Sequence, residues 1–202
     1  MNDIKDFPHA AKAMELFQIG TDRDIGWFAC ADSDPGAIQG EHALNRCDVS
    51  LNLGAGRKQI GDSIRLDLPY RGAHVEWDAD REPLDYADCS VGRIYAIHFL
   101  EHIKDPVTVL AECQRVLVEG GVLNVVVPYW RSQGAFHDLT HRFFFTEDTW
   151  KNTFDNDYHP KWPVEASVRR AGIFKWRWRI NTNLIMGLND RNMMLVTQLE
   201  KV

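Results

Sequence analysis

Several features that mark common protein classes are missing from this sequence of 202 residues. No apolar run approaches the roughly 18 residues that a membrane-spanning helix needs, and the N-terminus lacks the basic and apolar parts of a signal peptide. The four cysteines have neither the CxxC nor the histidine-paired spacing of a zinc site. We therefore expect a cytoplasmic protein with no membrane contact, no disulfide framework and no resident metal.

An excess of positive charge is also missing, since the net charge is −6. Proteins that bind nucleic acid draw much of their affinity from lysine and arginine contacts with phosphates, so an acidic average weighs against such a partner. One basic segment, with aromatic residues among its charges, holds Arg169, Arg170, Lys175, Arg177 and Arg179. Its alternation of basic and apolar residues fits a strand with one solvated face, and an RNA-binding ribbon is the alternative.

A glycine turn follows the first apolar strand of the chain. Leu51 to Gly56 ends in Gly-x-Gly, and Asp67 closes the next apolar run 13 residues after Gly54. In an open α/β sheet such glycines let the backbone approach an adenosine ligand, and the acid accepts hydrogen bonds from the ribose hydroxyls. A dinucleotide site would need a third glycine, where this chain has Gln59, and an acid about 20 residues on. The spacing therefore disfavours NAD.

A series of short motifs continues from this turn to about Thr149. They are Leu51 to Gly56, Asp67, Asp80, Pro83-Leu84, Leu100-Glu101-His102, Arg115-Val116-Leu117, Gly120-Gly121, Val127-Pro128 and Asp138-Leu139-Thr140-His141. In this order they resemble the class I S-adenosylmethionine-dependent methyltransferases, most of all a small bacterial and phage branch. The resemblance implies S-adenosylmethionine as the cofactor. Asn52 departs from the pattern, because many relatives carry an acid there, and Ala55 replaces a common Cys or Ser.

Apolar runs alternate with helical patterns along the chain. We predict strands at 47–53, 64–68, 75–77, 93–99, 122–127, 174–181 and 193–199. Helices are predicted at 10–17, from Asp105-Pro106 to Gly120-Gly121, and from Thr146 onward. This order indicates an α/β fold with a doubly wound sheet. The resemblance implies that the sheet is Rossmann-like and mostly parallel, and that the last strand, in the C-terminal hairpin, is antiparallel to the rest. Residues 47–202 would form the methyltransferase domain, and residues 1–46 an extension that serves as a lid or as a contact in a homodimer.

The predicted cofactor site gathers at the carboxyl ends of the parallel strands. Asp67 would hold the ribose, and by resemblance Asp80 would lie near the adenine amino group, with Asp78 as its alternative. His98 would contact the methionine end of the cofactor or the acceptor, whereas Glu101 and His102 would shape the next turn. The full set of predicted cofactor-binding residues is Asn52, Gly54, Ala55, Gly56, Asp67, Leu68, Asp80 and His98.

The predicted catalytic residues are His141, His137 and Asp138, which follow the fifth strand among several phenylalanines. Methyl transfer to a hydroxyl or an amine needs a base for the released proton, and histidine titrates in the right range. His141 is our first candidate for this base and His137 the second, with Asp138 to fix the histidine tautomer. Two histidines four residues apart would also suit a metal on a helix, but Thr140 and the aromatic residues indicate a loop.

We expect a methyltransferase that modifies an oxygen or nitrogen of a small polar acceptor. By analogy with relatives of this branch, the acceptor would be a sugar or polysaccharide precursor. An RNA-directed methyltransferase is one alternative, although the Asn/Asp-Pro-Pro-aromatic motif of exocyclic-amine enzymes is replaced here by His98-Phe99-Leu100-Glu101, and no Pro-Cys nucleophile occurs. A non-enzymatic accessory protein that binds S-adenosylmethionine is the other.

Overall fold

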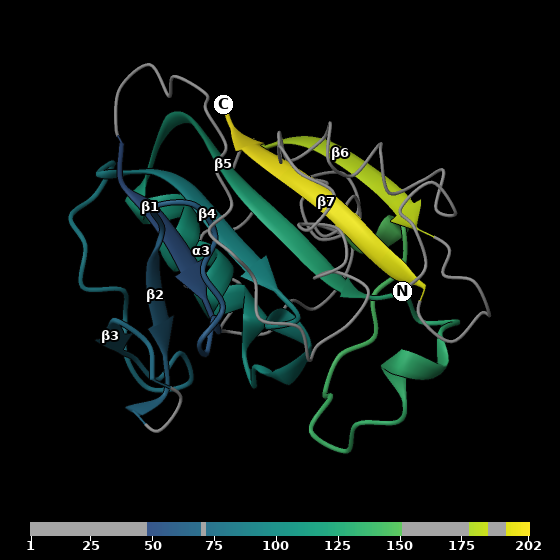
Figure 1. Ribbon diagram of the computed structural model, residues 1–202. Coiled ribbons are helices and arrows are strands. Elements are labelled where there is room, and N and C mark those ends of the chain that lie inside the picture. The colour runs from purple at the N-terminus through teal and green to yellow at the C-terminus, as the bar shows by residue number, and fades with distance from the viewer. Residues whose placement is uncertain (1–47, 70–71, 151–177, 186–192) are drawn as a thin grey trace.

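The computed structural model describes residues 48–69, 72–150, 178–185 and 193–202, and only the backbone of 178–185. These residues build a seven-stranded sheet in the order β3-β2-β1-β4-β5-β7-β6 (Figure 1). The strands are β1 (Ser50–Leu53), β2 (Ile64–Asp67), β3 (Val75–Glu76), β4 (Val91–Ile97), β5 (Leu117–Pro128), β6 (Trp178–Ile185) and β7 (Met194–Lys201). Helix α3 (Pro106–Val116) and the short 3-10 helices η3 (Leu100–His102) and η4 (Gln133–Ala135) lie between them.

The parallel half of the sheet decides where a ligand can bind. β1 pairs in parallel with β2 and β4, β2 with β3, and β4 with β5. Every residue of β4 is buried, as a central strand covered on both faces requires. Because these strands run the same way, their carboxyl ends share one edge of the sheet, where open α/β folds bind their ligands.

The C-terminal strands complete the sheet in the opposite sense. β7 pairs antiparallel with β5, from Val122↔Glu200 to Pro128↔Met194, and antiparallel with β6. The predicted fold is therefore confirmed: the sheet is Rossmann-like and mostly parallel, and a C-terminal strand runs against its neighbours. No helix among the described residues is long and apolar enough to cross a membrane.

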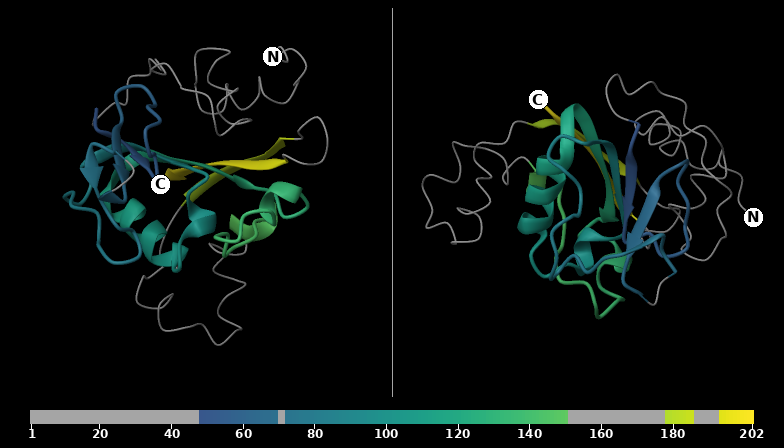
Figure 2. Two further views of the ribbon diagram at one scale, coloured as in Figure 1. Left: turned by 60° about the horizontal axis from the view of Figure 1, so that its bottom comes forward. Right: turned by 90° about the vertical axis from the view of Figure 1, so that its left-hand side faces the viewer.

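Helix α3 covers one face of the sheet (Figure 2). Its apolar side consists of Val109, Leu110, Cys113 and Val116, which are buried in the main core with the strand residues. The helix begins as predicted: Pro106 takes the first helical position, and the Asp105 carboxylate accepts a hydrogen bond from the Thr108 amide.

The end of α3 corrects the prediction that it would run to Gly120-Gly121. The helix stops at Val116, and β5 begins at the next residue. The last carbonyls of the helix are taken by distant partners, since the amides of Cys89 and Ser90 donate to the carbonyls of Arg115 and Val116 at 3.0 and 2.8 Å. Both glycines therefore lie inside β5.

Other boundaries shift by a few residues. β1 begins at Ser50, β2 ends at Asp67 and β3 at Glu76, while β7 extends two residues beyond the predicted end, to Lys201. β4 spans 91–97 instead of 93–99, because His98 leaves the strand with a φ of +51°. The helix predicted from Thr146 begins at Asp148.

Several predictions fall on parts of the chain that the structure does not describe. They concern the extension at 1–46 with its helix at 10–17, Cys47, residues 174–177 of the hairpin, and the side chains of the basic segment.

Candidate active site

The glycine turn lies between β1 and β2 at the carboxyl edge of the sheet. Gly54 and Gly56 have φ angles of +64° and +53°, which favour glycine over any residue with a Cβ. The amides of Gly54 and Ala55 both donate to the Leu66 carbonyl, at 2.8 and 3.3 Å. These bonds fix the turn to the end of β2, so the backbone is shaped before any ligand arrives.

Asp67 closes the turn from the other side. Its Oδ2 accepts a hydrogen bond from the Gly56 amide and its Oδ1 one from the Leu68 amide, both at 2.7 Å. A carboxylate offers about four acceptor positions, so these two bonds orient the group and leave positions for hydroxyl donors. The residue predicted to bind the ribose is thus also the residue that holds the glycine turn in place.

Asn52 presents a buried acceptor at the end of β1. Its side-chain amide donates to the Lys58 carbonyl at 3.1 Å. Its Oδ1 is buried and has no hydrogen-bond partner among the residues that the structure describes. An orphaned acceptor of this kind is costly unless a ligand donates to it. The amino group of a bound S-adenosylmethionine is a donor of the type required, so the residues of this turn fit the cofactor.

Asp80, predicted to lie near the adenine, is engaged within the protein. Its Oδ1 accepts a hydrogen bond from the Lys104 amide at 2.8 Å, and Oδ2 lies 3.7 Å from Lys104 Nζ. The alternative residue, Asp78, accepts from the Asp80 amide at 3.0 Å and pairs with Arg81. Both acids therefore order the turns that border the glycine loop.

A buried carboxylate, Glu101, occupies the turn after β4. Its side chain is 1% exposed. Oε1 accepts a hydrogen bond from Nδ1 of His98 at 3.2 Å, and Oε2 is buried without a partner in the described part of the chain. His98 is fixed by its backbone as well, since its amide donates to the Val126 carbonyl at 2.8 Å. Its ring is 38% exposed, so Nε2 remains available to a ligand.

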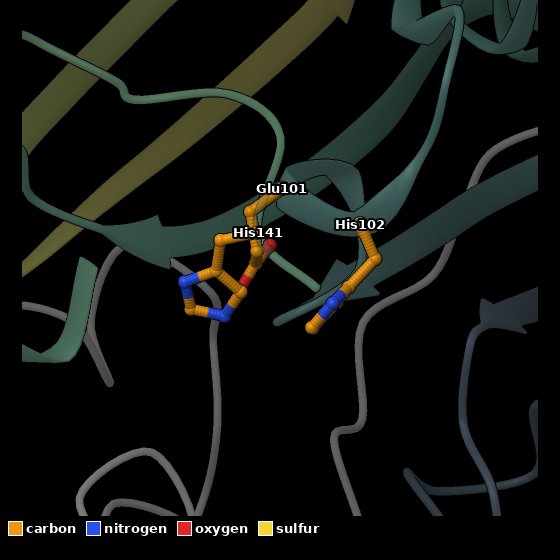
Figure 3. Close-up of side chains that lie close together, drawn as sticks. All are labelled: Glu101, His102 and His141. Atoms are coloured by element: carbon orange, nitrogen blue, oxygen red, sulfur yellow. The ribbon is translucent and has the colours of Figure 1, made fainter. Parts of the chain in front are cut away.

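Two more histidines, His102 and His141, lie close to the same carboxylate (Figure 3). One nitrogen from each ring and one oxygen of Glu101 all lie within 4.8 Å of one another. The two rings meet edge to face, with their centroids 4.7 Å apart. The Glu101 carbonyl accepts a hydrogen bond from the Arg142 amide at 2.7 Å, which ties the His141 loop to η3.

The electrostatics favour a neutral ring at His102 and an ionised carboxylate at Asp138. Burial lowers the pKa of His102 from its ordinary value, against the opposing charge of Glu101. Hydrogen bonds from the Thr140 hydroxyl and amide lower the pKa of Asp138. The cluster therefore combines a neutral imidazole with fixed negative charge.

The structure separates the three predicted catalytic residues. His141 joins the cluster, whereas His137 is exposed and lies outside it. Asp138 does not fix the tautomer of His141, because its Oδ2 lies 4.0 Å from His141 Nε2, beyond hydrogen-bonding distance. The Ala135 carbonyl has that role: it accepts from Nδ1 of His141 at 3.0 Å.

The structure also brings into the site two residues, Glu101 and His102, that were predicted only to shape a turn. Glu101 and His102 meet His141 across 39 residues of chain. The adjacency of an acid and a histidine at the end of a predicted strand was the available signal. No feature of the sequence indicates that these two residues lie close to His141.

Exposed aromatic rings border this cluster on the loop that carries His141. Phe136 and Phe144 stack with their centroids 4.7 Å apart and are 60% and 48% exposed. Leu139 between them is almost fully exposed. Such a surface suits the apolar face of a ring-shaped ligand.

Residues 57–125 match the family model of a methyltransferase domain. The match begins directly after Gly56, the second glycine of the turn, and runs through β2, β3, β4 and α3 into β5. A search of curated proteins finds no match to this chain.

Solved structures resemble the whole fold. A proposed methyltransferase of Haloferax volcanii, in complex with the Trm112 methyltransferase activator, is 18% identical with a TM-score of 0.51 over 100% of this chain and 99% of that one. A SAM-dependent methyltransferase of Archaeoglobus fulgidus is 14% identical with a TM-score of 0.51, over 78% and 88% of the two chains. A proposed methyltransferase of Bacillus halodurans is 12% identical with the same score, over 95% and 98%.

At these identities the likeness shows the fold, which is that of the class I methyltransferases. Together with the domain match it supports a methyltransferase enzyme with S-adenosylmethionine as its cofactor.

Proposed function

We propose that this chain transfers a methyl group from S-adenosylmethionine to an oxygen or nitrogen of a small polar acceptor, with a sugar or a polysaccharide precursor as the acceptor class. One observation carries the proposal. The glycine turn, Asp67, His98 and the His141 loop follow β1, β2, β4 and β5, four strands whose parallel pairing puts their carboxyl ends at one edge of the sheet.

The cofactor would occupy the β1–β2 side of this edge. Asp67 would accept hydrogen bonds from the ribose hydroxyls, and charge-assisted bonds of this kind are strong. The unpartnered Oδ1 of Asn52 would accept from the amino group. When bound, S-adenosylmethionine supplies a methyl group on a positively charged sulfur, which leaves as a neutral thioether.

The acceptor would lie on the β4–β5 side, against the exposed rings of Phe136 and Phe144. Its hydroxyl or amine must lose a proton as the new bond forms. His141 and His98 each bind a protein oxygen through Nδ1, which leaves Nε2 as the basic nitrogen. We keep His141 as the first candidate base and His137 as the second, and add His98 as a third.

We also propose a division of the chain into two parts. Residues 47–202 would form the methyltransferase domain, and residues 1–46 a lid or a homodimer contact.

Calorimetric titration of S-adenosylmethionine and S-adenosylhomocysteine tests the cofactor site. We expect micromolar binding by the wild-type chain and at least a tenfold loss in Asp67→Ala. Asp62→Ala removes an exposed acid from the same stretch of chain and serves as the matched control. Thermal unfolding of each variant separates lost binding from lost folding, because Asp67 also fastens the glycine turn. Folded wild-type protein that gives no heat with either ligand contradicts the proposal.

A second experiment addresses the acceptor. Release of S-adenosylhomocysteine is measured with a panel of sugars, nucleotide sugars, small amines and RNA. Turnover limited to hydroxyl-bearing sugars supports the acceptor class, whereas turnover on RNA alone contradicts it.

A further inference from the structure

We propose that Glu101, His102 and His141 bind a divalent transition-metal ion at the carboxyl edge of the sheet. The sequence predicted no resident metal, and the two histidines that it considered as a pair were His137 and His141. The structure brings together a different set, from η3 and from the loop after β5 (Figure 3).

The hydrogen bonds of the two histidines leave the same nitrogen free on each ring. Nδ1 of His141 donates to the Ala135 carbonyl, which can only accept. Nδ1 of His102 lies 2.8 Å from the Thr140 hydroxyl oxygen, whose own proton is donated to Asp138 at 2.7 Å. His102 must therefore donate through Nδ1, and Nε2 of each ring keeps its lone pair.

Glu101 contributes the negative charge of the set. Oε1 is held by His98, and Oε2 is buried with no hydrogen-bond donor among the described residues. A buried carboxylate without a full set of partners is strongly disfavoured. A cation between Oε2 and the two free nitrogens would satisfy all three lone pairs at once.

The donor set indicates the class of ion. Two imidazoles and one carboxylate, with positions left for water or substrate, suit Zn²⁺, Fe²⁺, Co²⁺ or Mn²⁺ better than Mg²⁺ or Ca²⁺. Bonds of about 2.0–2.2 Å place neighbouring ligand atoms roughly 3–3.5 Å apart. In this structure one nitrogen of each ring and one oxygen of Glu101 lie within 4.8 Å of one another, so binding an ion would require the three side chains to move closer together.

The hydrogen bonds that His102 and His141 donate through Nδ1 are of the kind that metal-binding histidines make. Such histidines donate their second N–H to a carbonyl or, directly or through a relay, to a carboxylate, which fixes the ring and raises its basicity. The Ala135 carbonyl does this for His141, and the Thr140–Asp138 pair does it for His102. Asp138 thus orients the site instead of acting on the acceptor.

The position of the site narrows the acceptor class, an assignment that rests on the proposed function. Phe99 joins the two halves of the edge, because its ring lies against Gly54 while the next residue begins η3. An ion at Glu101 would therefore adjoin the cofactor turn. A hydroxyl oxygen bound to a divalent ion loses its proton more readily, which favours an alcohol or sugar hydroxyl over an amine. With the lone pair of His141 engaged by the ion, His137 and His98 remain as the candidate bases.

The test uses tag-free, full-length protein treated with a chelator and then titrated with CoCl₂, because bound Co²⁺ acquires visible absorption bands that report its ligands. We expect one strong site per chain. His102→Ala, His141→Ala and Glu101→Gln should each weaken Co²⁺ binding at least tenfold. His137→Ala, a histidine of the same loop outside the cluster, should keep the wild-type affinity.

Each result bears on the proposal. Absence of the bands in folded wild-type protein overturns it, and so does wild-type affinity in all three site variants. Circular dichroism confirms that the variants fold, and Glu101→Gln keeps the shape of the buried side chain. Titration of S-adenosylhomocysteine on the same samples keeps the two proposals distinct. Cobalt binding without cofactor binding supports the metal site and contradicts the methyltransferase; the reverse result contradicts only the metal site.

Discussion

The ring of Phe99 lies so close to Gly54 that a Cβ added to the glycine would stand 2.4 Å from Phe99 Cδ2. The turn that would hold the cofactor and the turn that carries Glu101 and His102 are therefore in direct contact. Gly54 is required for two independent reasons: its φ of +64° and the space that the ring occupies.

Gly54→Ala should lower the free energy of unfolding and abolish binding of S-adenosylhomocysteine. The positive φ costs about 1–2 kcal/mol with a Cβ, and the overlap with Phe99 adds about 1–3 kcal/mol. Gly120→Ala is the matched control, because Gly120 has a φ of +76° but open space around it. It should show only the conformational cost. Urea unfolding measures both, and equal destabilisation of the two variants would contradict the role of Phe99.

Arg115→Met should destabilise the fold by about 1–3 kcal/mol in urea unfolding, because it leaves two partly buried carbonyls without their donor. The guanidinium donates to the carbonyls of Leu84 and Tyr86 and pairs with Glu112 and Asp88. It therefore fastens the segment between β3 and β4 onto α3.

Arg81→Met is the control for Arg115→Met. Arg81 forms a surface ion pair with Asp78 and its side chain is 78% exposed, so its loss should change stability by less than about 0.5 kcal/mol. Similar values for the two variants would show that the carbonyl contacts of Arg115 do not stabilise the fold.

Cys113 should resist alkylation in the folded protein at pH 8, whereas Cys89 should react. Burial raises the pKa of Cys113 to about 12, so the thiol remains protonated and out of reach, while Cys89 is exposed. The stability that this protonation contributes is complete below the unfolded pKa of 9.0 and is lost as the pH rises toward 12. Peptide mapping after iodoacetamide treatment, with and without urea, measures the difference. Equal modification of the two cysteines without urea would contradict the burial of Cys113.

Thr140→Val should weaken Co²⁺ binding about tenfold, because loss of an outer hydrogen-bond partner costs metal sites 10–100-fold in affinity, to order of magnitude. The substitution removes the hydroxyl between His102 and Asp138 and leaves every ligand in place. Thr108→Val removes a similar threonine–aspartate bond at the start of α3 and should leave the affinity unchanged. The Co²⁺ titration measures both variants. Wild-type affinity in Thr140→Val would contradict the proposal that the Thr140 hydroxyl orients His102 for metal binding.

Where local residues decide the structure, the sequence predicted it well. The Gly-x-Gly turn, the acid that ends β2, and the Asp105-Pro106 start of α3 depend on neighbours in the chain. The alternation of strands and helices indicated the doubly wound α/β class, and the resemblance to the methyltransferases supplied the antiparallel last strand.

The sequence could not predict what distant contacts decide. α3 ends at Val116 because Cys89, Ser90 and Lys201 supply donors to the carbonyls at its end, and β5 then continues without a loop. A distant contact also decides which residues His141 meets, so the residues next to it in the sequence do not predict them. The Arg142 amide donates to the Glu101 carbonyl, and this contact places the ring of His141 near His102 and away from His137.

The chain leaves the sheet after β5 and returns to the end of β5 at Phe145. Tyr129 and Phe145 form a parallel bridge, and the Trp130 amide donates to the Phe145 carbonyl at 3.0 Å. The residues between these two anchors, Phe136, Leu139 and His141 among them, form a loop. None of them pairs with β5 in the sheet. This segment is therefore a loop whose sequence can vary more freely than that of the strands. A segment of another length or composition between the same two anchors would change which molecules the protein accepts, as long as it kept Ser132 and Arg142, whose contacts with Met193 and Glu101 hold the segment to the start of β7 and to η3.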